Sequence, residues 1–176
     1  MSVSIFLDRD GTLIEDVGYL SSPDDIRVLP GVIEGLQLFT KNKYQLHLVS
    51  NQSGLARGKF SKADFEQVEQ RFYAVFLENG IQFCTAHYCF HSPEENCACR
   101  KPKSGMLEKV AEIEVIDKNR SAMVGNSESD RGAAAAFGIP YWDVNTDEEF
   151  NSKVGIFEIQ AIRIVACFER VLNELG

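Results

Sequence analysis

Two aspartates one residue apart, Asp8 and Asp10, lie where an apolar run meets a glycine, in the stretch IFLDRDGT. Like charges at this spacing repel each other unless a cation lies between them, and a divalent ion such as Mg²⁺ takes the oxygen ligands that carboxylates offer. The other interpretation is a plain turn, because Asp-Gly is common in turns. The pair alone does not decide between a metal site and a turn.

Polar side chains also follow the later apolar runs. Ser50 and Asn51 follow the second run, Arg100 and Lys101 the third, and Asn126 the fourth. If these runs are parallel strands of one sheet, ligands bind beyond their carboxyl ends. A hydroxyl, an amide and two cations are groups that bind phosphate. Together the strand ends favour a site for a phosphorylated ligand over a turn.

Four candidate metal ligands form a second group. Cys89 and His91 lie two residues apart, as do Cys97 and Cys99, on either side of the polar segment SPEEN. Alternate residues of an extended chain point the same way, so each pair can offer two ligands to one ion. Four protein ligands leave no position for water, which predicts a structural Zn²⁺ in a loop at about 89 to 99. The other interpretation is packing cysteines beside a surface histidine.

The elements that must position these residues alternate along the chain. Apolar runs predict strands, and amphipathic patterns between them predict helices. The strands cover about 3 to 7, 44 to 50, 87 to 90, 121 to 125 and 139 to 144, and the helices about 31 to 42, 62 to 78, 105 to 115 and 129 to 137. A terminal helix at about 157 to 175 follows a polar break at 145 to 153. The alternation predicts an α/β fold, a Rossmann-like three-layer sandwich with a mostly parallel sheet.

The helix at 62 to 78 has the clearest ends. Ser61 is its predicted N-cap, with Asp64 three residues later, and Asn79-Gly80 is its predicted stop. Its predicted core stripe consists of Phe65, Val68, Phe72, Val75 and Phe76.

Length and charge limit the possible partners. A chain of 176 residues with 44% hydrophobic content suits one domain, 1–176, with a proper core. A formal charge of −8 repels a phosphate backbone at long range, so we expect no nucleic acid partner. The sequence has neither a membrane span nor a secretory leader pattern, so we expect a cytoplasmic protein that does not bind membranes. We also expect a monomer that binds a small phosphorylated metabolite.

Four segments, DRDGT, SNQSG, KP and GNSESD, resemble in order the motifs of the haloacid dehalogenase superfamily of phosphatases, across roughly residues 4 to 144. The resemblance implies that Asp8 attacks phosphorus to give an aspartyl-phosphate. Asp10 then protonates the leaving oxygen and later activates water. Lys101 and Mg²⁺ neutralise the phosphoryl group, with Mg²⁺ held by Asp8, the backbone of Asp10 and the fourth motif. Thr12 and Ser50 belong to the implied phosphate-binding set.

One position departs from the superfamily pattern. The fourth motif usually has aspartate after its glycine, and here it has Asn126, with Asp130 four residues later. An amide oxygen can bind Mg²⁺, but more weakly than a carboxylate, and we expect Asp130 to support the metal directly or through water. A non-catalytic protein that only binds a phosphosugar therefore remains an alternative.

The metal loop narrows the resemblance to two related groups, the D,D-heptose 1,7-bisphosphate phosphatases and the histidinol phosphatases. The stretch NQSGLARGKF resembles the heptose group, and it carries Arg57 and Lys59 near the expected phosphate site. The favoured substrate is therefore a sugar bisphosphate used to make the heptose of lipopolysaccharide, with histidinol phosphate as the alternative. No stretch is long enough for a cap domain, so the site should be open. Arg57 and Lys59 could also lie on a solvated loop, and Arg9 could be an outward-facing surface charge.

Overall fold

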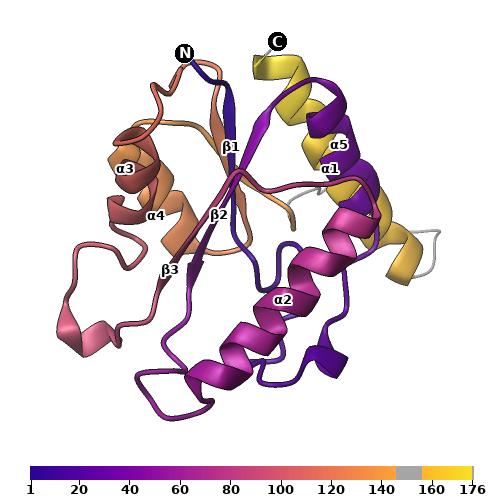
Figure 1. The fold of residues 1–176 in the computed structure, drawn as a ribbon. Coiled ribbons are helices and arrows are strands. Elements are labelled where there is room, and N and C mark those ends of the chain that lie inside the picture. Colours follow the sequence, from indigo (N-terminus) through magenta and orange to yellow (C-terminus); the bar gives the residue numbers. More distant parts are fainter. Residues whose placement is uncertain (146–155, 176) are drawn as a thin grey trace.

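A five-stranded sheet runs through the molecule in the order β3-β2-β1-β4-β5, with every neighbouring pair parallel (Figure 1). The computed structural model describes residues 1–145 and 156–175, with side chains up to 145 and from 165 onward. The strands are β1 (Ser4–Leu7), β2 (Gln45–Asn51), β3 (Thr85–Cys89), β4 (Ala122–Gly125) and β5 (Tyr141–Asp143).

Helices cover both faces of this sheet (Figure 1). One face carries α1 (Val32–Lys41), α2 (Lys62–Glu78) and α5 (Ile156–Leu175), and the other carries α3 (Gly105–Ala111) and α4 (Glu128–Phe137). Two short 3-10 helices, η1 (Pro23–Asp25) and η2 (Pro93–Glu95), lie in loops. Side chains of β1 alternate between the two cores, with Ile5 and Leu7 on the α1 side and Phe6 on the α3 side. The predicted three-layer α/β architecture is confirmed.

Helix α2 begins and ends where the sequence predicts. Ser61 and Asp64 form a reciprocal capping box, and Gly80 takes a φ of +73° after the last turn. The core stripe differs from the prediction at two positions, because Val75 is only half-buried and Glu69 is buried at 8% exposure. A carboxylate therefore lies on the apolar face of this helix.

Helix α3 ends at Ala111, earlier than the predicted residue 115. The chain after it runs beside the N-terminus, where the N–H of Ser2 donates to the carbonyl of Val115 at 2.8 Å. The terminal helix is present as α5, whereas the polar break lies, beyond Asn145, outside the described residues. Within residues 1–145 and 156–175, no helix is both long and apolar enough to cross a membrane.

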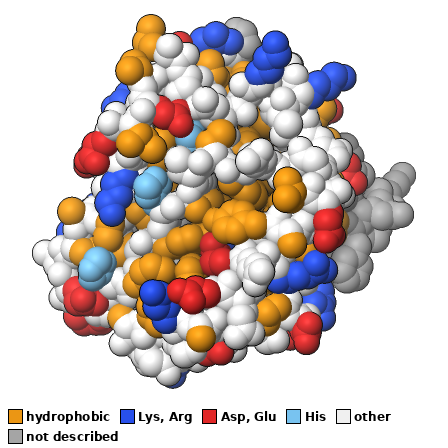
Figure 2. Space-filling model, in the orientation of Figure 1, with side chains coloured by type: hydrophobic (Ala, Val, Ile, Leu, Met, Phe, Trp, Pro, Cys, Tyr) orange, Lys and Arg blue, Asp and Glu red, His pale blue; other side chains and the backbone are white. Residues whose placement is uncertain are grey.

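Strand β3 lies at the edge of the sheet, and only Cys89 among its side chains is fully buried. Figure 2 shows hydrophobic side chains gathered over β3 and the adjoining part of α2. The half-buried aromatic residues of this region include Tyr73, Phe83 and Tyr88. The edge strand thus leads from a half-exposed aromatic surface to the first residue of the Cys/His group.

Candidate active site

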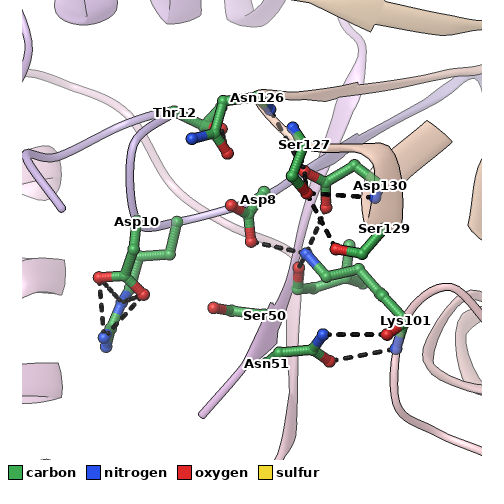
Figure 3. Close-up of polar contacts among 12 residues, drawn as sticks. Asp8, Asp10, Thr12, Ser50, Asn51, Lys101, Asn126, Ser127, Ser129 and Asp130 are labelled. Carbon is green, nitrogen blue, oxygen red and sulfur yellow. Dashed lines mark hydrogen bonds and ion pairs between the residues drawn. The ribbon is translucent and has the colours of Figure 1, made fainter. Parts of the chain in front are cut away.

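The predicted site residues meet at the carboxyl edge of the sheet (Figure 3). The ladder of β1 continues one residue past the strand, because the N–H of Asp8 donates to the carbonyl of Val124 at 3.1 Å. This contact holds Asp8, at the end of β1, against β4, and 8% of the surface of Asp8 is exposed. The ends of β2 and β4 bring Ser50 and Asn126 to the same edge, and the loop after β3 brings Lys101 there (Figure 3).

Lys101 is buried and makes three contacts through its Nζ. It lies 2.6 Å from Oδ1 of Asp8, 2.6 Å from Oδ1 of Asp130 and 2.8 Å from the carbonyl oxygen of Val49. Burial by itself would lower the pKa of Lys101, but the two carboxylates outweigh that effect and raise it. The lysine is therefore a fixed ammonium.

Asp8 lies where a further cation is favourable. Burial raises the pKa of Asp8 to about 6, and Asp130 and Asp10 add to the rise, while Lys101 opposes it. Two neighbouring carboxylates share the single ammonium of Lys101, so a divalent ion beside Asp8 would relieve the remaining repulsion.

Asn51 acts on the backbone of Lys101. Its Oδ1 accepts from the N–H of Lys101 at 3.1 Å, and its Nδ2 donates to the carbonyl of Lys101 at 3.2 Å. These two bonds hold the lysine in register with the end of β2 (Figure 3). Contact of Asn51 with a substrate stays a prediction.

Asp10 is held from two sides. Arg9 donates to its carboxylate through Nε and Nη2 at 3.1 to 3.2 Å, and Nε2 of Gln52 donates to its Oδ2 at 2.6 Å. The same Nε2 donates to Oγ of Ser50 at 2.9 Å, which links the ends of β1 and β2. Arg9 is 1% exposed, so its interpretation as an outward-facing surface charge was wrong. Its position is explained by the two carboxylates that it pairs with, Asp10 and Glu69.

Asn126 closes the other side of the site. Its Oδ1 lies 3.4 Å from Oγ1 of the buried Thr12. A Cβ on Gly11 would lie 2.1 Å from Nδ2 of Asn126, so this approach requires a glycine. Oxygen atoms of Asp8, Asp10 and Asn126 around one edge are the hard donors that Mg²⁺ prefers, and these residues fit that ion.

Asp130 uses both of its oxygens within the protein. Its Oδ1 contacts Lys101, and its Oδ2 accepts from the N–H groups of Asn126 and Ser127 at 3.2 and 3.1 Å and from Oγ of Ser127 at 2.6 Å. It is fully buried as part of the capping box of α4. Asp130 therefore positions Lys101 and the fourth motif.

The four candidate metal ligands converge in one cluster, Cys89, His91, Cys97 and Cys99, whose ligand atoms all lie within 4.8 Å of one another. The three Sγ atoms are 3.3 to 3.5 Å apart, and Nδ1 of His91 lies 3.3 Å from Cys99 Sγ and 3.6 Å from Cys89 Sγ. A tetrahedral Zn²⁺ with Zn–S bonds of about 2.3 Å spaces its sulfur ligands about 3.8 Å apart. The cluster can therefore hold such an ion after a small expansion.

Side chains that flank Lys101 in the sequence bond to the backbone of the cluster loop. Nζ of Lys103 donates to the carbonyls of Asn96 and Cys97 at 2.9 and 2.8 Å, and Nη1 of Arg100 donates to the carbonyl of His91 at 3.2 Å. The loop thus closes on itself beside Lys101.

A pair of cations lies on the exposed loop after β2. Nη1 of Arg57 lies 3.3 Å from the hydroxyl of Tyr19, and Nζ of Lys59 lies 5.6 Å from the centre of its ring. Both side chains are exposed, and a direct role in binding substrate stays a prediction.

Sequence reasoning missed three supporting residues, Arg9, Gln52 and Glu69. A usable signal existed for Glu69 alone, because it lies four residues after Phe65 and three before Phe72, within the predicted apolar stripe. A charged residue at such a position indicates a buried partner.

Comparisons with known proteins identify the relatives of this chain. Residues 3–157 match the family model described as polynucleotide kinase 3 phosphatase. A D-glycero-beta-D-manno-heptose-1,7-bisphosphate 7-phosphatase of Helicobacter pylori is 41% identical over 128 residues, which are 72% of this chain and 74% of that protein. A protein of the same name from Vibrio cholerae is 40% identical over 143 residues, 77% of each chain.

Solved structures of phosphatases are similar to this chain over nearly its full length. A D,D-heptose 1,7-bisphosphate phosphatase from B. bronchiseptica, complexed with magnesium and phosphate, has a TM-score of 0.80 at 29% identity and covers 99% of both chains. A HAD-like phosphatase from Mesorhizobium loti has a TM-score of 0.80 at 26% identity and covers 97% of this chain and 87% of its own.

Proposed function

Since the chain belongs to the haloacid dehalogenase superfamily, in the family described as polynucleotide kinase 3 phosphatase, we propose that it removes the 7-phosphate of D-glycero-D-manno-heptose 1,7-bisphosphate. The chain is a phosphatase, and the name of its relatives at about 40% identity supports this substrate. The observation that carries the chemistry is the 2.6 Å contact between Asp8 and the buried ammonium of Lys101.

The reaction proceeds in two steps. A carboxylate oxygen of Asp8 attacks phosphorus, the bond from phosphorus to the sugar oxygen breaks, and Asp10 gives its proton to that oxygen. Asp10 then takes a proton from a water molecule whose oxygen attacks the aspartyl-phosphate. The bond between phosphorus and Asp8 breaks, which releases phosphate and restores both carboxyl groups. Beside Asp8, the ammonium of Lys101 neutralises charge on the phosphoryl group in both steps, and Ser50 holds a phosphoryl oxygen.

Two metal ions complete this proposal. Asp8, the backbone carbonyl of Asp10 and Asn126 would hold Mg²⁺, which supplies neutralisation of the phosphoryl charge when bound. The Cys/His cluster would hold a structural Zn²⁺, supported by its four converging ligand atoms. That ion would fix the loop that carries Lys101.

The charge distribution supports a small substrate. A net charge of −8 disfavours a nucleic acid, while Arg57, Lys59 and Arg100 offer local cations for the second phosphate of a sugar bisphosphate. We place the protein in the cytoplasm, as a monomer, in synthesis of the heptose of lipopolysaccharide. Histidinol phosphate is the competing substrate with the same chemistry.

The decisive experiment measures phosphate release from the heptose bisphosphate and from histidinol phosphate, side by side, with Mg²⁺ and with Asp8→Asn as the control. Turnover of the heptose ester that disappears in the control supports the proposal. Turnover of histidinol phosphate alone would make histidinol phosphate, and not the heptose bisphosphate, the substrate. If the wild type releases phosphate from neither ester and the Asn126→Asp variant does, the protein would be a phosphosugar-binding protein instead.

A further inference from the structure

We propose that Glu69 is a positioning residue which, through Arg9, sets where the carboxylate of Asp10 lies. The proposal rests on the proposed function, in which Asp10 moves the protons. Glu69 lies on α2, outside the four sequence motifs, and it touches none of the groups that would contact the phosphate. Its connection to the chemistry runs through one guanidinium.

Arg9 divides its donors between two carboxylates. Its Nε and Nη2 face Asp10 at 3.1 to 3.2 Å, and its Nη1 faces Oε1 of Glu69 at 3.1 Å. The side chain is 1% exposed, so water cannot replace either partner. A planar guanidinium fixed at Nη1 can present its other edge in only one orientation. The position of Glu69 therefore determines the direction from which Arg9 holds Asp10.

Glu69 is itself fixed at its second oxygen. Oε2 accepts a hydrogen bond from the hydroxyl of Tyr88, and that hydroxyl lies 2.9 Å from the hydroxyl of Tyr73. Tyr88 is on β3, opposite Ser50 of β2 in the parallel register. The chain Tyr88–Glu69–Arg9–Asp10 thus connects the sheet edge to the proposed general acid.

A purely structural ion pair would stabilise the fold without affecting proton transfer. Two features favour the positioning role. Arg9 donates directly to the carboxylate of Asp10, so a rotation of its guanidinium acts on that carboxylate. Gln52 holds Asp10 from the other side at 2.6 Å, and a two-sided clamp fixes a direction as well as a distance.

The two roles predict different kinetics. With p-nitrophenyl phosphate, the leaving nitrophenolate needs no proton, so Asp10 is required only when water attacks the aspartyl-phosphate. With a sugar phosphate, Asp10 is required in both steps. A displaced Asp10 should therefore lower kcat on both esters, but lower kcat/KM only on the sugar phosphate. A general loss of active structure lowers kcat/KM on both.

The test compares Glu69→Gln with Glu66→Gln, the same change on the exposed surface of α2. For Glu69→Gln we expect kcat on p-nitrophenyl phosphate to fall about ten-fold or more, kcat/KM to change less than about two-fold, and nitrophenol to appear in a burst of about one equivalent. On the heptose bisphosphate, kcat/KM should fall about ten-fold. Glu66→Gln should match the wild type.

Tyr88→Phe removes the support behind Glu69 while keeping the carboxylate, and it should show the same pattern at about two- to five-fold. It tests the proposal if Glu69→Gln does not fold. Equal kcat in the two glutamine variants, or a parallel loss of kcat/KM on both esters, would overturn the positioning role. Absence of any turnover in the wild type would overturn the proposed function, and the inference with it.

Discussion

The Nζ of Lys101 lies 2.6 Å from Oδ1 of Asp8, and both side chains are buried. The contact places a fixed positive charge beside the carboxylate that would attack phosphorus. Because Asp130 binds the same Nζ, the lysine is shared between the site and the start of α4. One side chain would therefore contribute both to the proposed chemistry and to stability.

Lys101→Met should lower phosphate release by about 10³-fold, because it removes a preorganised cation from the transition state. It also leaves Asp8 and Asp130 buried together without their cation, which should lower the free energy of unfolding by about 3 kcal/mol or more. Steady-state kinetics and urea unfolding measure the two effects. Lys109→Met, an exposed lysine on α3, is the matched control. Wild-type activity in Lys101→Met would contradict this assignment.

Asn126→Asp should lower the Mg²⁺ concentration for half-maximal activity by about ten-fold, because a carboxylate binds the ion more tightly than an amide. The same change adds a negative charge near Asp8, so it should lower Tm without Mg²⁺ and raise Tm with it. Thermal unfolding at several Mg²⁺ concentrations measures this reversal of sign. A Tm that shifts in one direction under all conditions would exclude Asn126 from the metal site.

Cys97→Ser should reduce bound zinc from about one equivalent to a small fraction, because structural sites need all four ligands. Activity should fall with it, since the loop also carries Lys101. Elemental analysis and kinetics on the same preparations test the link. Cys84→Ser, an exposed cysteine outside the cluster, should keep both zinc and activity. Full activity in a zinc-free protein would show that the loop is ordered without metal.

His47 should make stability depend on pH. Burial lowers the pKa of His47 from 6.5 to about 4, with His87 adding to the effect, although Glu114 lies 3.9 Å away. Between these two pKa values the unfolded chain binds more protons than the folded protein. The contribution of His47 to the free energy of unfolding is therefore complete above pH 6.5 and is lost as the pH falls toward 4.

Wild-type stability should therefore drop by about 2 kcal/mol more than that of His47→Gln between about pH 7.5 and about pH 5. Glutamine can keep bonds to Ser4 and Thr85, the present partners of the ring. Urea unfolding of both proteins at both pH values isolates the histidine, because all other titrating groups are common to the pair. Parallel pH profiles would show that the pKa of His47 is the same in the folded and the unfolded protein.

Arg57→Ala should raise KM for the heptose bisphosphate by about five- to ten-fold and leave KM for p-nitrophenyl phosphate unchanged, because only the first substrate has a second phosphate to bind. Lys62→Ala, an exposed lysine at the start of α2, controls for the lost surface charge. An equal effect on both esters would show that Arg57 binds the phosphate that both substrates share, and not the second phosphate.

Strand ends, helix caps and the Cys/His spacing could be predicted because each is encoded within a few residues. The capping box of Ser61 and Asp64 and the β1 run that ends at Asp8 need no distant partner to be recognised. The parallel sheet then follows from the alternation of elements, and it brings Asp8 and Lys101 to one edge although 93 residues separate them.

Burial of charge could not be predicted in the same way. Arg9 lies in the strongest motif, yet whether it faces solvent or the interior depends on Glu69, a carboxylate 60 residues away on α2. The side chain of Asn51 is of a type that can bind phosphate, but its amide bonds to the backbone of Lys101.

The sequence by itself determined which groups are available and which strand end carries each, since local pattern and spacing fix both. Only the tertiary structure decided which cation pairs with which carboxylate, because a buried charge takes the partner that packing brings within about 3 Å. Asp130 demonstrates the distinction, since its place in the α4 capping box is local, whereas its ion pair with Lys101 exists only in the folded chain.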